Sequence, residues 1–470
     1  MSTLLVNPPY SEKIYQSKKA PSVQPPIGLA YLAAFLEQEG EKVGILDANA
    51  EQLSVEETAR RICDSGAKFI GFGAVTPIIP IVYRIAGLVR KDSDAVIFVG
   101  GPHVTFMDDV TLNDCQAIDY IVRGEGELVI NNLIRTVKVN GDISRVRGIT
   151  YRKGDSIVKN EPEKLITDIN TLPFPARHLL PLDLYRPSPL FDRGYKGKSY
   201  ARIMTTRGCP TRCIFCVSPH FWGRVRIRSA ENVFAEIKHL YDIYDVRHID
   251  FLDDTLTLAP SRMEKICDLM IEHSYKINWT CYSRVDTLSE ALVKKMKMAG
   301  CSVIQLGVES GNQKIIKRIK KNIRLEDVER VARIVRKNNI KLMADFMIGL
   351  PGETEETVIQ TIDFAKKIKP NIAAFCITTP LPGTELYWEL RREGKIKPGY
   401  IWGNMGLHYG SNYSTEYLSS GRLSELYHLA HKKFYLRFKF FGQSFVWLLK
   451  NPYDIKNYFY LAKDLLLKRV

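Results

Sequence analysis

Short apolar segments alternate with helical segments along most of the chain, and this alternation limits the possible folds more than any other sequence feature. In residues 1–140 the apolar segments are nearly continuous, which is typical of strands buried on both faces of a parallel sheet. The pattern therefore predicts a Rossmann-like, doubly wound parallel sheet of the α/β class. The predicted strands are Thr3–Asn7, Lys42–Asp47, Ala67–Ala74, Ala95–Gly100 and Tyr120–Arg123, and the predicted helices are Gly28–Glu39, Val55–Cys63, Ile81–Arg90 and one from Glu127.

A second alternation follows, with six strand–helix repeats in about 190 residues. It predicts a partial or complete TIM-type (β/α)6 barrel at 196–390, with its chemistry at the carboxyl ends of the strands. Residues 141–195 are predicted to connect the two units through a hairpin and a Pro-rich stretch. The predicted hairpin is Ile149–Val158, and the predicted barrel strands are Ala201–Thr205, His248–Leu252, Asn278–Tyr282, Val303–Val308, Lys341–Ile348 and Ala373–Thr378.

The composition excludes several other classes of protein. The 470 residues are 45% hydrophobic and 25% charged, unlike a disordered, collagen-like or disulfide-scaffold chain. No apolar run reaches about 18 residues, and the start MSTLLVNPPY lacks the pattern of a signal peptide. We therefore expect a cytoplasmic protein with reduced thiols. The net charge of +15 allows an anionic partner without identifying it.

Three of the nine cysteines, Cys209, Cys213 and Cys216, lie within eight residues, directly after the first predicted barrel strand. The spacing Cys-x3-Cys-x2-Cys can hold three irons of a 4Fe–4S cluster and leave the fourth iron open to a nitrogen and a carboxylate. A structural zinc ion is the alternative, because His220 supplies a fourth ligand. Arginines near that site would then favour a zinc-binding, RNA-binding protein.

The ends of the predicted N-terminal strands carry glycines and small polar residues, which let a backbone approach a large flat ligand. Turn geometry alone is the other interpretation of these glycines. The first strand is not followed by Gly-x-Gly-x-x-Gly, so the pattern disfavours a dinucleotide. The candidate residues are Gly73, Thr76, Gly100, Gly101, His103, Gly124, Glu125 and Gly126.

The cysteine spacing, with Phe215 just before the third cysteine, resembles the radical SAM superfamily. Over residues 1–390 the chain resembles its cobalamin (vitamin B12)-binding members. The resemblance implies that Cys209, Cys213 and Cys216 bind the cluster. It also implies that later strand ends hold S-adenosylmethionine, with Asp253 or Asp254 at the methionine ammonium, and Ser283, Arg284 and Glu309 at its carboxylate and ribose.

The N-terminal unit resembles the cobalamin domain of the same family, and the candidate residues at its strand ends would line the cobalamin site. The sequence departs from many cobalamin enzymes because Asp-x-His-x-x-Gly is absent and Asn7-Pro8-Pro9-Tyr10 ends the first strand. No protein histidine is therefore implied below the cobalt. For His103 we expect packing in the loop rather than axial ligation.

The resemblance implies cleavage of S-adenosylmethionine to a 5′-deoxyadenosyl radical, which abstracts hydrogen from an unactivated carbon, and methyl transfer from methylcobalamin. A methyltransferase is the first interpretation, and a cyclase resembling the anaerobic magnesium-protoporphyrin monomethyl ester cyclase is the second. Either enzyme needs an electron donor such as a flavodoxin, a ferredoxin or a reductase. The predicted substrate is a small or lipid-like molecule.

Residues 391–470 form a predicted helical extension rich in basic and aromatic residues. Residues 432–470 contain nine basic and two acidic side chains, interleaved with aromatic ones. Such a sequence is compatible with contact to an anionic membrane surface. Packing over the barrel with a solvated basic face is the other interpretation. No nucleic-acid-binding module is recognisable, so nucleic acid is not an expected partner.

Overall fold

The computed structural model describes residues 2–10, 23–187, 200–396, 413–450, 452 and 455, and the chain forms two compact units. Parts of the predicted linker (188–195), of the predicted barrel (196–199) and of the C-terminal extension therefore lie outside the described residues. The first unit comprises Met1–Tyr185, Val217–Arg226 and Leu381–Met405, and the second comprises Arg186–Cys216, Ile227–Pro380 and Gly406–Val470.

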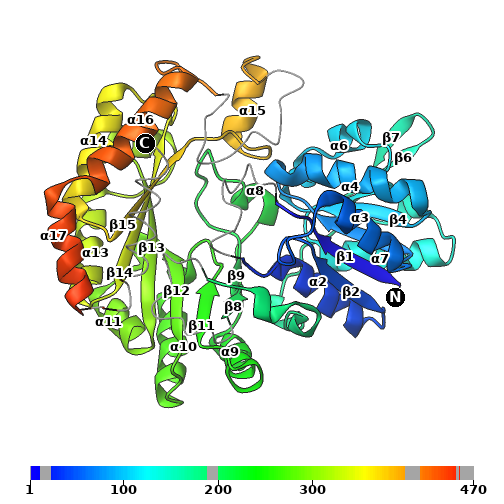
Figure 1. The fold of residues 1–470 in the computed structure, drawn as a ribbon, viewed down its shortest axis with the longest axis horizontal. Coiled ribbons are helices and arrows are strands. Elements are labelled where there is room, and N and C mark those ends of the chain that lie inside the picture. Colours follow the sequence, from blue (N-terminus) through cyan, green and yellow to red (C-terminus); the bar gives the residue numbers. More distant parts are fainter. Residues whose placement is uncertain are drawn as a thin grey trace. The chain divides into compact units, whose positions relative to one another are not determined.

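The first unit is built on a seven-stranded sheet with the order β2-β1-β3-β4-β5-β6-β7 (Figure 1). Its first five strands pair in parallel, which confirms the predicted doubly wound sheet. The strands are β1 (Thr3–Asn7), β2 (Val43–Asp47), β3 (Phe69–Gly73), β4 (Val96–Gly100), β5 (Tyr120–Val122), β6 (Ile149–Lys153) and β7 (Ser156–Lys159).

Alternate side chains of these strands enter two separate cores, one on each face of the sheet. Leu4 and Val6 of β1 pack into the core shared with α3 (Val55–Asp64) and α4 (Ile79–Asp92). Leu5 packs into the opposite core with α2 (Ile27–Gln38) and α7 (Gly126–Lys138). Because a strand alternates its side chains between faces, the nearly continuous apolar runs are explained by burial on both sides.

The hairpin β6–β7 differs from its predicted place in a connector. Strand β6 pairs antiparallel with β5, so the hairpin extends the first sheet rather than linking the two units. The Thr150 hydroxyl donates to the buried Asp108 carboxylate over 2.7 Å, which ties the hairpin to α6 (Asp108–Asp114). The first unit therefore continues past residue 140, to Tyr185.

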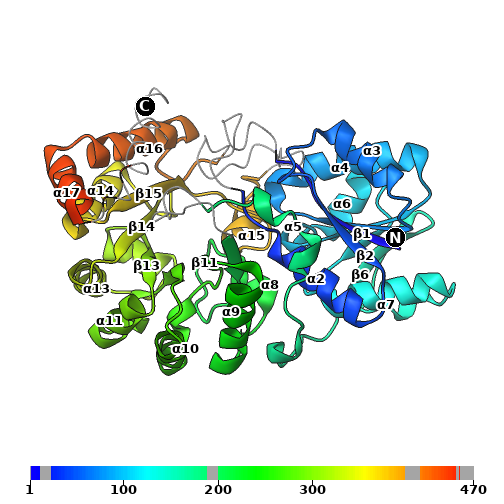
Figure 2. The same cartoon turned by 60° about the horizontal axis from the view of Figure 1, so that its bottom comes forward.

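The second unit contains a six-stranded, wholly parallel sheet with the order β15-β14-β13-β12-β11-β8, which confirms the predicted β/α architecture. Figure 2 shows the covering helices side by side. The strands are β8 (Tyr200–Ile203), β11 (His248–Phe251), β12 (Asn278–Ser283), β13 (Cys301–Glu309), β14 (Lys341–Ile348) and β15 (Ile372–Ile377), and the helices are α9 (Ala230–Tyr244), α10 (Pro260–Glu272), α11 (Glu290–Met298), α12 (Gln313–Arg318), α13 (Leu325–Lys337) and α14 (Glu355–Ile368).

Two helices of the C-terminal extension belong to this second unit, α16 (Ser420–Tyr435) and α17 (Phe438–Lys450). The buried Tyr435 hydroxyl donates to the Ala373 carbonyl over 2.8 Å, which fixes α16 beside β15. By contrast, α15 (Glu385–Arg392), which begins in the predicted barrel, belongs to the first unit. Among the described residues, we find no helix with the length and apolar character needed to cross a bilayer.

Candidate active site

The three clustered cysteines lie in the loop that follows β8, and all three line one cavity of about 440 Å³ in the second unit. Cys213 is buried, while Cys209 and Cys216 are partly exposed. Burial raises the pKa of the Cys213 thiol, and the nearby Lys321 ammonium acts in the opposite direction. The volume is within the range of small-molecule sites, about 300–1,000 Å³.

The donor set fits a cluster that is bound through several irons. Among the described residues, no three His, Cys, Asp or Glu side chains converge on one ion position. A 4Fe–4S cluster does not need such convergence, because each of the three thiolates binds a different iron. Phe215 lines the same cavity beside the cysteines. That the three cysteines bind the cluster stays a prediction, and this geometry is compatible with it.

Asp253 anchors the start of the cysteine loop. Its carboxylate accepts hydrogen bonds from the Thr205 backbone N–H at 3.1 Å and the Thr205 hydroxyl at 2.9 Å. Burial raises the pKa of Asp253, and contacts with Thr206 and Arg262 lower it. Asp253 lines the cavity, so the ligand-binding role stays a prediction, and its carboxylate also fixes Thr205, four residues before Cys209. Asp254 also lines the cavity and is exposed.

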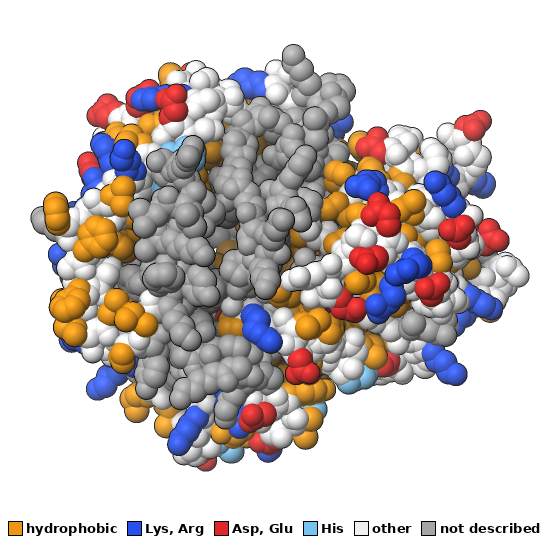
Figure 3. Space-filling model, viewed as in Figure 1, with side chains coloured by type: hydrophobic (Ala, Val, Ile, Leu, Met, Phe, Trp, Pro, Cys, Tyr) orange, Lys and Arg blue, Asp and Glu red, His pale blue; other side chains and the backbone are white. Residues whose placement is uncertain are grey.

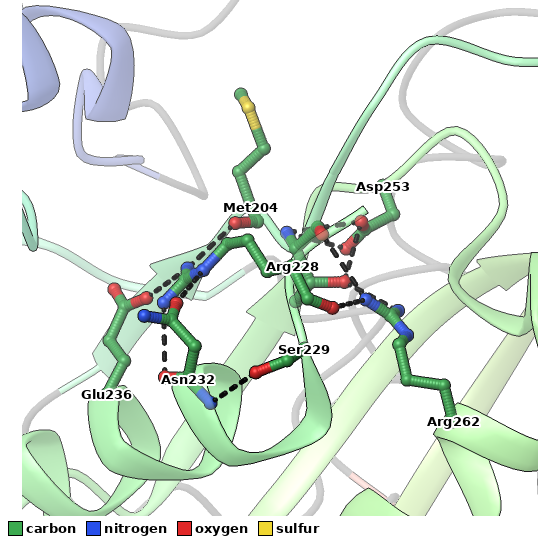
Figure 4. A network of polar contacts seen from close by, with 8 residues as sticks. Met204, Arg228, Ser229, Asn232, Glu236, Asp253 and Arg262 are labelled. Carbon is green, nitrogen blue, oxygen red and sulfur yellow. Dashed lines mark hydrogen bonds and ion pairs between the residues drawn. The ribbon is translucent and has the colours of Figure 1, made fainter. Parts of the chain in front are cut away.

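A network of buried arginines holds this anchor in place (Figure 4). The Arg262 guanidinium donates to the Thr205 hydroxyl and to the Arg228 carbonyl, both over 2.9 Å. The Arg228 guanidinium in turn donates to the Met204 carbonyl and pairs with the buried Glu236 carboxylate. The residues after β8 are therefore fixed by Arg262 of α10 and by Arg228, which precedes α9 and pairs with Glu236 of that helix.

Arg284 and Ser283 follow one another at the end of β12 and line the cavity. The Arg284 guanidinium already binds both carboxylate oxygens of Asp286, at 3.0 and 2.8 Å. Arg284 thus already forms an ion pair within the protein, and a substrate carboxylate would have to share this guanidinium. Ser283 is buried and accepts a hydrogen bond from the Thr257 hydroxyl over 3.1 Å.

Glu309 ends β13 in an unusual backbone conformation. Its φ is +67°, in the left-handed region that non-glycine residues seldom adopt, and it lies at a register shift between β13 and β14. Its carboxylate pairs with the Lys321 ammonium over 2.7 Å, and both side chains are largely buried. Such strained positions persist only where their surroundings hold them, and they are common in functional sites.

The cavity residues that were not among the candidates from the sequence include Arg202, Tyr282, Lys321 and Asp345. Lys321 had no local signal, because it belongs to a Lys320-Lys321 pair that reads as a surface turn. Asp345 did have a signal, because it is a carboxylate within the apolar strand β14. Burial, followed by the nearby Glu309 charge, raises the pKa of Asp345 to about 7, and its carboxylate accepts from the Gln305 amide over 2.7 Å.

The glycines that were predicted to line a ligand site in the first unit lie at the carboxyl ends of its parallel strands. We call these strand ends the rim. Gly73 and Gly100 are direct partners across β3 and β4. Gly101 has a φ of +117°, and a Cβ atom there would lie 2.5 Å from the Ala74 carbonyl oxygen. Only glycine permits this close approach of two loops. The neighbouring loop carries Gly124 and Gly126.

His103 and Glu125 of this rim have partners within the protein. The His103 Nδ1 atom lies 3.1 Å from the Thr76 hydroxyl, and burial lowers the pKa of His103 to about 4. This neutral, buried imidazole fits the packing role expected for it. The Glu125 carboxylate pairs with the Arg226 guanidinium over 2.7 Å, and both are buried. Glu125 was a predicted cofactor-binding residue, but the structure uses its carboxylate in this internal ion pair.

Comparisons with known proteins agree with both halves of this description. The radical SAM superfamily model matches residues 203–365, and the B12 binding domain model matches residues 17–134. The chain is 34% identical over 446 residues, 93% of each protein, to an uncharacterized methyltransferase of Pyrococcus horikoshii. It is 30% identical over 374 residues to the anaerobic magnesium-protoporphyrin IX monomethyl ester cyclase of Rubrivivax gelatinosus, covering 78% of this chain and 66% of the relative.

A solved structure has the same fold. The radical S-adenosylmethionine methyltransferase TsrM from Kitasatospora setae, solved with cobalamin and a 4Fe–4S cluster bound, superposes with a TM-score of 0.69. The match covers 84% of this chain and 79% of TsrM at 19% sequence identity.

Proposed function

Because the chain belongs to the B12-binding radical SAM proteins, we propose that this cobalamin-dependent radical SAM enzyme is a methyltransferase acting on an unactivated carbon. One structural observation carries the proposal most directly. Cys209, Cys213 and Cys216 line the same cavity as the charged side chains of Arg284 and Glu309, where a zwitterionic nucleotide would be held. The identity with a protein named as a methyltransferase supports methyl transfer over other outcomes.

The cofactors are a 4Fe–4S cluster, S-adenosylmethionine and cobalamin, which together supply the radical and methyl-transfer chemistry when they are bound. The protein contributes placement. We propose that Asp253 or Asp254 accepts from the methionine ammonium, that Arg284 donates to the carboxylate, and that Glu309 accepts from the ribose hydroxyls, because all of them line this cavity. Leu252 and Phe215 supply apolar lining that excludes water from this cavity.

We further propose that a flavodoxin, a ferredoxin or a reductase delivers electrons to the cluster, and that the substrate is a small or lipid-like molecule. The first proposal rests on the redox requirement of the cluster, and the second on the volume of the cavity, about 440 Å³. Neither proposal depends on the other, so each can be tested on its own.

The experiment for methyl transfer uses the full chain, reconstituted anaerobically with iron, sulfide and hydroxocobalamin. We expect S-adenosylhomocysteine to form from S-adenosylmethionine in the presence of a reductant, and its formation to require the corrin. The Cys213→Ala variant should lose iron and this activity. The Cys63→Ala variant, which changes a cysteine outside the cavity, should keep both. Formation of 5′-deoxyadenosine without any S-adenosylhomocysteine would contradict the proposal.

The second candidate is an oxidative or ring-forming enzyme, and the 30% identity with the Rubrivivax cyclase favours it. The two candidates predict different products. Growth with trideuteromethyl-methionine should add a trideuteromethyl group when a methyltransferase converts its substrate to product, whereas a cyclase adds no labelled methyl group to its substrate. Mass spectrometry of cell extracts, compared with a strain lacking the protein, separates these outcomes.

A further inference from the structure

Helix α17 has apolar side chains on opposite sides, and only one of these sides is packed. Phe440, Ser444 and Trp447 recur at helical spacing and are buried. The Phe440 ring packs against the rings of Phe434 and Tyr435, with centroids 5.5 and 5.1 Å apart. This side attaches α17 to α16 and to the rest of the second unit.

The opposite side, which we call the α17 face, consists of Phe438, Phe441, Phe445, Val446 and Leu449. Phe438 is 96% exposed, Phe445 64% and Leu449 69%. Figure 3 shows hydrophobic side chains gathered on the surface over α17. Soluble proteins seldom expose contiguous apolar side chains of this size without a partner.

The surroundings of the α17 face are basic. From residue 432 to residue 450 the chain has five basic residues and no acidic one. Lys432 and Lys433 are exposed in the last turn of α16, and Lys450 is exposed at the end of α17. The Gln443 amide donates to the Lys369 carbonyl over 3.0 Å, so the exposed Lys369 also lies beside α17.

We propose that the α17 face docks the protein on an anionic lipid bilayer. An apolar helix face edged by lysines is the pattern of helices that lie in the membrane interface, with aromatic side chains among the acyl chains and ammonium groups at the headgroups. With 13 residues, α17 is shorter than the roughly 20 residues that a spanning helix needs, so it lies in the plane of the surface.

A second copy of the chain fits this face less well. Self-association through α17 would bring two basic surfaces together, because Lys432, Lys433 and Lys450 have no acidic neighbours in residues 432–450. Like charges across an interface oppose binding. An anionic bilayer offers acyl chains to the aromatic side chains and negatively charged headgroups to the lysines.

The test is sedimentation of the full-length protein with vesicles of phosphatidylcholine, with or without phosphatidylglycerol. We expect binding to the anionic vesicles that weakens as salt is added. The variant Phe438→Ser/Phe441→Ser/Phe445→Ser should bind about tenfold or more weakly, because burial of aromatic side chains drives this mode of binding. These side chains are exposed, so the variant keeps its core contacts, and circular dichroism checks that it is folded.

The matched control is Ile243→Ser/Met298→Ser, which removes two apolar side chains that are similarly exposed on α9 and α11. It should bind anionic vesicles as the unchanged protein does. Equal binding to neutral vesicles, or unchanged binding by the triple variant, would overturn the proposal. So would a dimer in light scattering that the triple variant abolishes, because the face would then serve a second copy.

Discussion

At the scale of single residues, the site depends on an ion pair that holds its most strained backbone position. Glu309 is the last residue of β13 and Lys321 lies between α12 and α13, and their side chains pair over 2.7 Å in largely buried surroundings. Breaking such a pair leaves one charge without its partner in a medium that solvates it poorly. Removing both charges together avoids this penalty.

We therefore expect Lys321→Met to lower the free energy of unfolding by about 2 kcal/mol or more. The double variant Glu309→Gln/Lys321→Met should recover much of this loss. Urea denaturation of the protein without cofactors measures both effects. If Lys321→Met alone were as stable as the unchanged protein, the pair would contribute little to the stability of the site.

A second buried carboxyl makes stability depend on pH. Glu353 is fully buried, and burial raises its pKa to about 8, although the Leu350 and Gly349 backbone N–H groups donate to it. The folded state therefore holds a proton that the unfolded state releases at lower pH. The resulting stability is fully present below the unfolded pKa and is lost as pH rises through about 8.

We expect Glu353→Gln, which keeps an oxygen acceptor but does not titrate, to gain stability relative to the unchanged protein as pH rises. Thermal midpoints of the two proteins at about pH 5 and about pH 9 give the comparison. The difference between the midpoints should move in favour of the variant at the higher pH. A difference that does not change with pH would show that Glu353 does not titrate in this range.

At the scale of elements, close approaches between loops shape the rim of the first sheet. The Ala74 N–H donates to the Gly100 carbonyl over 2.8 Å, and Gly101 has no room for a side chain against Ala74. Gly124 also has a positive φ, +71°, but open space surrounds the position of its missing Cβ. A side chain at either position would strain the backbone, but only a side chain at Gly101 would also collide with a neighbouring atom.

We expect Gly101→Ala to destabilise the first unit by more than the roughly 1 kcal/mol of strain expected for Gly124→Ala, because Gly101 combines a steric conflict with a backbone conformation that essentially only glycine adopts. Because the Gly101 loop lies at the predicted cobalamin rim, Gly101→Ala should also reduce corrin retention after gel filtration. Thermal melts and corrin absorbance measure the two effects. If the two variants had equal melting temperatures and equal corrin retention, the loops at Ala74 and Gly101 would be able to move apart without a loss of stability.

The strands of both parallel sheets were predictable from the sequence, because their apolar runs record burial on two faces. Strands β1 and β14 begin and end at the predicted residues. The pairing of β6 with β5 was not predictable, because local pattern does not specify which distant strand a hairpin joins. The short helix α5 (Pro102–Phe106) was missed because five residues carry no clear period.

The candidate site was predictable to a smaller extent. The spacing of the three cysteines indicates a metal-binding loop, so the sequence predicted that they lie in one loop and share one site. The pairing of the charged residues could not be predicted from the sequence. Glu125 and Arg226 are 101 positions apart, and the residues around Lys321 do not distinguish it from a surface lysine. Pairing across such distances is a property of the folded chain.

At the scale of the whole molecule, the first unit is larger than the strand–helix pattern of residues 1–140 predicts. Its hairpin protects the edge of β5, and Thr150 supplies a partner for the buried Asp108. A fragment that ends at residue 140 would expose that edge and leave Asp108 with fewer donors. Exposed strand edges promote association between chains.

We expect a fragment of residues 1–185 to melt at a higher temperature and to aggregate less than a fragment of residues 1–140. Both fragments lack the later segments of the unit, so the comparison isolates residues 141–185. Gel filtration and circular dichroism measure the two properties. Similar melting of both fragments would show that the hairpin adds little to the first sheet.

The first unit also recruits residues 217–226 and 381–396 from far along the chain, including Arg226, whose guanidinium neutralises Glu125. During translation the N-terminal residues leave the ribosome first; residues 217–226 follow β8, and residues 381–396 emerge only after β15, the last strand of the second sheet. Until residue 226 has been made, the Glu125 carboxylate lacks the Arg226 guanidinium, although the Ile166 backbone N–H can donate to it over 3.1 Å. The first unit is complete only when residues 381–396 have joined it, after synthesis of the second sheet.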